Sequence, residues 1–339
     1  MIRIGNAPCS WGVLEFGLEG ETADYRRVLD EMQETGYEGT ELGDWGFLPT
    51  DPHRLREELR ARGLSLLGAF VPVALKDPQA HAAGQEAAVR TARLLADVQA
   101  ELGSIPAELG SIPNGAPCIV LADDNGKDPV RAQNAGHIRP EHGLSAAEWQ
   151  TFALGAQRIA EAVRQATGLR TVFHHHCGGY VETPAEVDRL MGLTDPLLLG
   201  LCFDTGHYSY GGGDALSGIR KHASRIWHVH FKDYDPAVGA YVRTRHNSAR
   251  YGSARHGSAR HSSAETSAAA DGWGYLDAVR QGVFCPLGRG AVDWTGVVAE
   301  LRAMRYEGWI VVEQDVLPGQ GEPKGSARRN RAFLAELGL

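Results

Sequence analysis

The chain has 339 residues, of which 43% are hydrophobic and 22% are charged, and its formal net charge is −8. This composition is typical of a globular protein with a large core, and the negative charge argues against a nucleic-acid backbone as the main partner. The longest apolar runs have the length of strands and are too short to span a membrane.

Strand-like and helix-like segments alternate along the whole chain. In chain order, the expected strands are 2–8, 39–43, 65–73, 118–123, 169–176, 199–206, 225–233 and 308–315, and the expected helices are 22–35, 52–62, 79–102, 145–167, 184–193, 214–222, 292–304 and 326–337. Thr22, Asp51 and Thr183 are suitable N-caps, and Gly168 is a suitable C-terminal stop. Eight such pairs favour a single α/β domain over 1–339, a closed (β/α)8 (TIM) barrel rather than an open doubly wound sheet.

Two segments interrupt the alternation. ELGSIPA at 101–107 recurs as ELGSIPN at 108–114, which indicates a tandem-repeat insertion. The tract 243–270 contains SARYG, SARHG and SARHS and few apolar residues. We expect it to be a flexible, low-complexity surface loop after the seventh strand. Its Arg and His side chains suit an anion, but a solvated loop is the favoured interpretation.

The five cysteines are scattered and form no CxxC pair, and the N-terminus has no signal-peptide layout. Both features favour a reducing environment, so we expect a cytoplasmic protein. Neither feature decides the oligomeric state, and a homo-oligomer stays open.

Four residues of metal-ligand type stand at the ends of the last four expected strands: His174, Asp204, His230 and Glu313. The apolar runs before them are typical of buried parallel strands, and the carboxyl ends of barrel strands surround one pocket. His and carboxylate ligands without a thiolate suit Mn²⁺, Co²⁺, Zn²⁺ or Fe²⁺ rather than a structural zinc site. Any one of these residues alone is more often an ordinary core or rim group, but together they predict a divalent-metal site.

Further polar residues accompany the four. His176 is two positions after His174 and therefore on the same side of the strand. Lys232 is likewise two positions after His230. His207 belongs to the sequence DTGH, which we expect over the mouth of the barrel, and its imidazole titrates near neutral pH. We expect His176, Lys232 and His207 to reach the pocket.

Two residues on the first strands are candidates for substrate binding. Glu41 ends the second strand, where it would hydrogen-bond a polyol hydroxyl or form a structural salt bridge. Trp11 follows the first strand and would either line the pocket or serve packing alone. The sequence GRG at 288–290 lacks the rest of a phosphate-binding loop and is better interpreted as a tight turn.

Motifs along nearly the whole chain resemble the sugar phosphate isomerase/epimerase family, whose members have xylose-isomerase-like barrels. They are SWG at 10–12, TELG at 40–43, HHHCGGYVET at 174–183, DTGH at 204–207, HVHFKD at 228–233, PLGRGAVDW at 286–294 and GWIVVEQD at 308–315. Within this family, the motifs most resemble the branch of inosose (keto-inositol) dehydratases.

The resemblance implies a divalent metal held by one residue from each of the last four strands. The matching positions are His174, Asp204, His230 and Glu313. The first of these positions is usually Glu in the wider family, so His176 and Glu182 stay open as substitutes for His174.

The resemblance also implies a lyase of inositol catabolism that eliminates water from a keto-inositol or similar polyhydroxy ketone. Mn²⁺ or Co²⁺ would polarise the ketone and hold an enediolate. In this scheme His207 is the first choice of base, Lys232 is a cation beside the enediolate or the leaving oxygen, and His176 is the second proton-transfer group.

Other functions stay open. A keto-sugar isomerase or epimerase would use the same metal, and a dehydroshikimate-type dehydratase would use the same elimination. The His-x-His at 174–176 and the VEQD ending favour the inosose dehydratase over an epimerase. An abasic-site endonuclease shares the barrel but needs a basic DNA-binding face. A barrel that only binds sugars is disfavoured by the ligand set.

Overall fold

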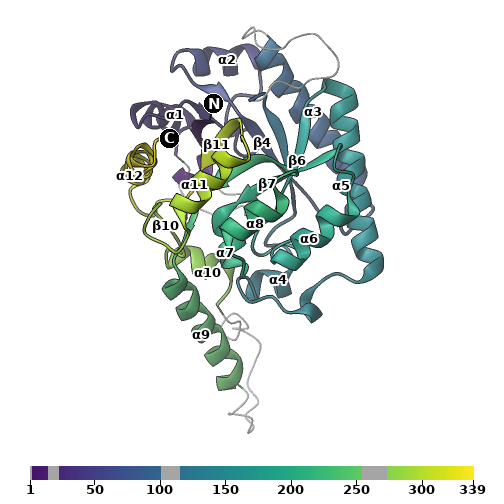
Figure 1. Cartoon of the computed structure of the whole chain (residues 1–339). Coiled ribbons are helices and arrows are strands. Elements are labelled where there is room, and N and C mark those ends of the chain that lie inside the picture. Colours follow the sequence, from purple (N-terminus) through teal and green to yellow (C-terminus); the bar gives the residue numbers. More distant parts are fainter. Residues whose placement is uncertain (1, 14–22, 101–114, 254–272) are drawn as a thin grey trace, which may run out of the picture.

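A closed barrel of parallel strands forms the centre of the molecule, and helices surround it (Figure 1). The structure is a computed structural model that describes residues 2–13, 23–100, 115–253 and 273–339. The barrel strands are β1 (Ile2–Asn6), β2 (Gly39–Thr40), β3 (Ser65–Leu66), β4 (Gly68–Val73), β5 (Cys118–Asp123), β6 (Arg170–His174), β7 (Leu199–Asp204), β8 (Ile226–Phe231) and β11 (Gly308–Val312).

The strand expected at 65–73 closes the barrel, because its two halves, β3 and β4, lie at the two ends of the strand order. Among the described residues, the sheet has nine strands in the order β3-β2-β1-β11-β8-β7-β6-β5-β4. β3 and β4 are two halves of the one strand expected at 65–73; β3 pairs with β2, and β4 pairs with β5. All pairs in this sheet are parallel. The prediction of a (β/α)8 barrel is therefore confirmed.

The helices follow the strands as the alternation predicts, with several additions. They are α1 (Tyr25–Glu34), α2 (Pro52–Arg60), α3 (Ala80–Ala100), α4 (Pro129–Gln133), α5 (Ala146–Thr167), α6 (Pro184–Leu193), α7 (Thr205–Tyr210), α8 (Ala215–His222), α9 (Pro236–Ser253), α10 (Tyr275–Arg280), α11 (Trp294–Ala303) and α12 (Pro323–Glu336), with 3-10 turns η1 (Pro8–Trp11) and η2 (Pro140–His142). None of the described helices is both long and apolar enough to cross a membrane.

Side-chain caps explain where several helices begin. Thr183 caps α6 through a capping box with Glu186, and Asp51 caps α2. The expected cap Thr22 lies outside the described residues, and α1 is capped instead by Asp24, which accepts from the backbone of Arg26. Every residue of β5 and β7 is buried, as expected for parallel strands covered on both faces.

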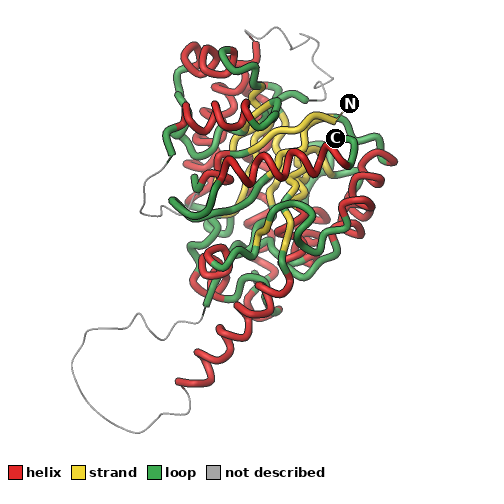
Figure 2. Tube along the Cα trace, turned by 90° about the vertical axis from the view of Figure 1, so that its left-hand side faces the viewer, coloured by secondary structure: helices red, strands yellow, loops and turns green. Residues whose placement is uncertain are grey.

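The connection after β8 differs most from the expectation. Within 243–270 we expected a flexible loop, but α9 continues to Ser253 and projects away from the barrel (Figures 1 and 2). Val242 and His246 of α9 are buried, and the ring of His246 hydrogen-bonds the carbonyl of Trp273 at 3.0 Å. The loop prediction was therefore wrong for 243–253. The rest of that tract, like the repeat 101–114, lies outside the described residues.

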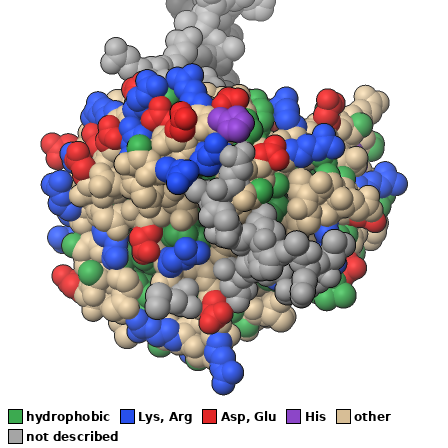
Figure 3. Space-filling view, turned by 90° about the horizontal axis from the view of Figure 1, so that it is seen from above, with side chains coloured by type: hydrophobic (Ala, Val, Ile, Leu, Met, Phe, Trp, Pro, Cys, Tyr) green, Lys and Arg blue, Asp and Glu red, His purple; other side chains and the backbone are tan. Residues whose placement is uncertain are grey.

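The same connection contains α10 and a small two-stranded antiparallel sheet of β9 (Asp233–Tyr234) and β10 (Phe284–Cys285). The turn 288–290 closes onto Asp233, whose carboxylate accepts from the backbone of Gly288 and Gly290 at 2.8 and 3.0 Å. GRG is therefore a turn, as the sequence favoured. Seen from above, acidic and basic side chains are interspersed over the described part of the surface (Figure 3).

Candidate metal centre

His174, Asp204, His230 and Glu313 come together at the carboxyl end of the barrel. One ligand atom from each lies within 4.8 Å of the others, and all four residues are buried. The strand register explains this convergence, because Asp204 of β7 is opposite His230 of β8 and His174 of β6 is opposite Cys202. The four side chains therefore enter the same end of the barrel from neighbouring strands.

Four buried atoms of this group lack hydrogen-bond partners. Both ring nitrogens of His174, Nδ1 of His230 and Oδ2 of Asp204 are buried and make no hydrogen bond. His174 Nε2 is 3.6 Å from Asp204 Oδ2, and His230 Nδ1 is 3.3 Å from Glu313 Oε1. Unbonded polar atoms are costly to bury, and a cation between them would bind one ring nitrogen of His174 together with His230 Nδ1 and Asp204 Oδ2. These residues therefore fit a divalent metal.

Glu41 determines which nitrogen of His230 faces this centre. Its Oε1 accepts hydrogen bonds from Nε2 of His228 at 2.8 Å and Nε2 of His230 at 3.0 Å. The lone pair of His230 is then on Nδ1, which faces the other ligand atoms. Burial alone would raise the pKa of Glu41, but the neighbouring imidazoles His230 and His228 lower it to about 2. A carboxylate behind a ligand imidazole is the usual arrangement around metals.

Glu41→Gln is expected to weaken metal binding by about 10- to 100-fold, because a neutral amide orients His230 less firmly and makes it less basic. Titration calorimetry with Mn²⁺ or Co²⁺ would measure the loss. Glu31→Gln is a matched control. Glu31, on α1, is also buried, but its carboxylate accepts from the indole of Trp11 at 2.8 Å and contacts no proposed ligand. Unchanged affinity in Glu41→Gln would mean that Glu41 does not orient His230.

Lys232 is a buried cation beside the four residues. Its Nζ donates to Asp315 Oδ1 at 2.9 Å and Oδ2 at 3.1 Å, and it lies 3.0 Å from Glu313 Oε2. Burial alone would lower the pKa of Lys232, but the carboxylates of Asp204, Asp315 and Glu313 raise it well above its usual value. Lys232 is therefore charged.

The local charge also favours a divalent cation. Four buried carboxylates surround the site (Glu41, Asp204, Glu313 and Asp315), and the ammonium of Lys232 offsets one of them. With the imidazoles neutral, as metal ligands must be, three negative charges remain in excess. A divalent cation would neutralise most of this excess.

His207 lies behind Lys232 rather than in the pocket. Its side chain is fully buried, it does not line the pocket, and its Nε2 is 2.9 Å from Lys232 Nζ. Asp204 caps α7 by accepting from the backbone of His207 at 2.7 Å, so the helix starts at once and turns the ring inward. Burial, and then the charges of His176 and Lys232, hold the pKa of His207 well below its usual value. The expected place of His207 over the mouth was therefore wrong, because its ring lies beside Lys232 and 3.6 Å from Asp315 Oδ2; its role as base stays a prediction.

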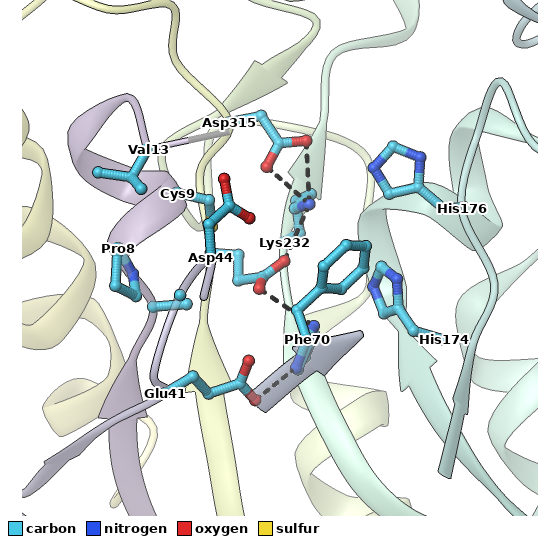
Figure 4. Close-up of a pocket in the computed structure, with 14 residues that line it drawn as sticks. Pro8, Cys9, Val13, Glu41, Asp44, Phe70, His174, His176, Lys232 and Asp315 are labelled. Carbon is cyan, nitrogen blue, oxygen red and sulfur yellow. Dashed lines mark hydrogen bonds and ion pairs between the residues drawn. The ribbon is translucent and has the colours of Figure 1, made fainter. Parts of the chain in front are cut away.

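His176 does line the pocket. Its Nδ1 is 2.6 Å from the carbonyl oxygen of Cys177, so this nitrogen carries the proton and the lone pair is on Nε2. Figure 4 shows Lys232 between one side formed by His174 and His176 and an opposite side formed by Glu41, Cys9 and Asp44.

The sequence analysis missed Asp315 among the pocket residues, together with Ala7, Pro8, Val13 and Gly43. It also missed three that bring a thiol, a carboxylate and a ring from the first strands: Cys9, Asp44 and Phe70. They come from η1, from the loop after β2 and from β4, on the side of the barrel opposite the ligand motifs. Desolvation by burial raises the pKa of Asp44. A polar residue just after a strand is the only sequence signal that could have found Asp44.

Two other candidates lie elsewhere. Trp11 does not line the pocket; it is 4% exposed in the main core, and its indole donates to Glu31. Its pocket role was therefore wrong, and the packing role is the observed one. Glu182, a substitute ligand, is bonded instead to the backbone of Gly136 and Gly178 at 2.7 and 2.8 Å. Burial raises the pKa of Glu182 to about 7.

Comparison with known proteins gives the same fold and a consistent group of relatives. Residues 29–337 match the xylose isomerase-like TIM barrel family. An inosose dehydratase of Geobacillus kaustophilus is 31% identical over 338 residues, which cover 99% of this chain and 94% of the relative.

Two solved structures have the same fold. A probable 3-DHS dehydratase from Bacillus anthracis superimposes with a TM-score of 0.62 at 15% identity, over 99% of both chains. An L-ribulose 3-epimerase superimposes with a TM-score of 0.63 at 16% identity, over 99% of this chain and 94% of the other. At such identities the two structures are informative about the fold alone.

Proposed function

The chain belongs to the xylose isomerase-like TIM barrel family, and on that premise we propose that it is a divalent-metal-dependent dehydratase acting on a keto-inositol or a similar polyhydroxy ketone. Its similarity to inosose dehydratases along nearly the whole chain makes it an enzyme of the lyase class. The observation that carries the proposal is the convergence of four buried ligand-type residues, with unbonded atoms, beside Lys232 and His176 in one pocket.

The chemistry requires stabilisation of negative charge. Dehydration beside a ketone removes the proton on the α-carbon and expels a hydroxyl from the next carbon, so charge develops on the ketone oxygen. A divalent metal held by His174, Asp204, His230 and Glu313 would act there as a Lewis acid. Lys232 adds a fixed positive charge in the same buried site, where an electrostatic interaction is stronger than in water.

His176 takes the role of base that the sequence suggested for His207. It lines the pocket, and the bond from its Nδ1 to Cys177 holds the ring with the lone pair on Nε2. A base positioned in this way contributes about 10²- to 10⁴-fold in rate. The imidazole of His207 instead contacts the ammonium of Lys232.

The proposed metal is Mn²⁺ or Co²⁺, because imidazole and carboxylate ligands together suit borderline divalent ions; Zn²⁺ and Fe²⁺ are alternatives. The proposed partner is a small polyol or keto-sugar, since charged and polar side chains, among them Glu41, Asp44 and Lys232, line the pocket beside the proposed metal ligands.

Metal-stripped protein should be mixed with scyllo-inosose, with and without Mn²⁺ or Co²⁺, while dione absorbance and product mass are followed. The expected product has lost one water, and its formation requires the metal. A product of unchanged mass would instead indicate an isomerase or epimerase, and turnover of dehydroshikimate alone would indicate the dehydroshikimate-type reaction. No turnover of any of these by the metal-loaded protein would overturn the proposal.

A further inference from the structure

Tyr275 reaches two pocket residues from outside the barrel. It is the first residue of α10, in the long connection between β8 and α11, and its side chain is 2% exposed. Its hydroxyl donates to Asp315 Oδ2 at 2.8 Å and lies 3.4 Å from His176 Nε2. Tyr275 does not line the pocket itself. Its hydroxyl therefore contacts the proposed base His176 and the carboxylate of Asp315 without facing the pocket.

Backbone packing determines the position of this tyrosine. Gly274, which precedes it, passes so close to α4 that a Cβ would lie 2.7 Å from the carbonyl oxygen of Ala132. The ring of Tyr275 then packs against His176, with ring centroids 5.1 Å apart, and against Phe284 at 6.4 Å. The start of α10 is thus held against the barrel, and the hydroxyl has little freedom to move away.

Asp315 connects this tyrosine to the pocket. It lines the pocket two residues after Glu313, and both of its oxygens accept from Lys232 (Figure 4). Tyr275 also donates to it, at Oδ2. A phenol has one proton to donate and an oxygen that accepts. The tyrosine can therefore donate to Asp315 while its oxygen accepts from a protonated His176.

We infer that Tyr275 links His176 to Asp315, so that the proton removed from the substrate's α-carbon is returned to its departing hydroxyl. This inference rests on the proposed dehydration. The C–H bond breaks, its electron pair forms a C=C bond to the carbonyl carbon while the carbonyl π pair moves onto the ketone oxygen, and the proton goes to His176 Nε2. The phenol oxygen accepts that proton while its own proton passes to Asp315 Oδ2.

Asp315 then donates the proton to the hydroxyl; the ketone re-forms from the charge on its oxygen, the enolate pair forms the new C=C bond between the α- and β-carbons, and the C–O bond breaks with its electron pair so that water leaves. His176, Tyr275 and Asp315 end in their starting protonation states, and nothing is oxidised or reduced. Asp315 is thus a catalytic residue, whereas Tyr275 is a positioning residue that acts through its two neighbours. The connection between β8 and α11 is therefore part of the active site.

Tyr275→Phe removes only the hydroxyl and is the test. We expect kcat for water loss to fall by about 10²- to 10⁴-fold while KM changes little, because the tyrosine does not line the pocket. In D₂O, the unreacted keto-inositol should gain deuterium at the α-carbon, because His176 still removes that proton but the hydroxyl departs slowly. With wild-type protein, elimination should outpace such exchange.

Tyr210→Phe is the matched control, because Tyr210 is buried in the same apolar cluster and its ring is 5.9 Å from Phe284. It should leave both exchange and elimination as in the wild type. Unchanged kcat in Tyr275→Phe, or an equal loss of exchange and elimination, would overturn the link. Should Tyr275→Phe fail to fold, Asp315→Asn is the second test. It must retain deuterium exchange at the α-carbon while elimination becomes slow, and any other result in that variant also overturns the link.

A failure of the proposed function itself would be distinguishable, because the wild-type protein would then release no water from the keto-inositol. If the link holds, the double variant Tyr275→Phe with Asp315→Asn should be no slower than the slower single variant, since both changes interrupt one path.

Discussion

Asp204→Asn is expected to abolish metal binding and dehydration while it stabilises the metal-free protein. Asp204 has two separate tasks: Oδ1 caps α7 by accepting from the backbone of His207 at 2.7 Å, whereas Oδ2 is buried and unbonded. Asn retains an oxygen for the cap and replaces the unbonded oxygen with an NH₂ group, which cannot bind a cation. The change also removes one of the carboxylates in excess around Lys232.

Thermal unfolding with and without Mn²⁺ would measure both effects. The wild-type protein should gain about 2.7 kcal/mol when the free metal is at 100 times its dissociation constant, and the variant should gain nothing. Asp214→Asn is the matched control, because Asp214 also caps a helix, by accepting from the backbone of Ser217 at 2.8 Å, but is exposed. A metal-dependent gain in Asp204→Asn would remove Asp204 from the ligand set.

The barrel and the convergence of ligand-type residues could be predicted because they depend on periodic features. Parallel strands covered on both faces must be apolar, so His174, Asp204, His230 and Glu313 are conspicuous where such runs end. The closure of the barrel also places those ends around one pocket. Neither inference needed the course of a loop.

The errors arose where strand periodicity was extended beyond the end of a strand. His207 was placed over the mouth, but α7 begins at Thr205 and its buried ring lies beside Lys232. An Asp three residues before His207 is a helix N-cap signal, and it could have indicated this turn. Composition alone also misjudged 243–253, because α9 is anchored through buried Val242 and His246.

Tyr275 had no signal in the sequence. It is 40 residues from Asp315 along the chain, in a connection without strand or helix periodicity long enough to place it. Its position depends on the close passage of Gly274 over α4, which is a tertiary contact. Such contacts are what a single sequence reveals least.

Lys232→Met is expected to lower the free energy of unfolding of the metal-free protein by about 3–5 kcal/mol, because it leaves buried carboxylates without their partner. Lys232 is 1% exposed and holds both oxygens of Asp315 and Oε2 of Glu313. Dehydration should also be lost, since no other ammonium lines the pocket in the described part of the chain. Urea unfolding and turnover of the keto-inositol would measure the two effects.

Lys76→Met is the matched control for this prediction. Lys76 pairs with Asp128 at 3.3 Å, but its side chain is 39% exposed, so its loss should cost no more than about 1 kcal/mol. Lys232→Met leaves negative charge uncompensated, and a divalent metal would neutralise part of it. Saturating Mn²⁺ should therefore reduce the destabilisation of Lys232→Met and leave the effect of Lys76→Met unchanged. Equal destabilisation of Lys232→Met with and without Mn²⁺ would show that the ammonium and the metal do not share the same carboxylates.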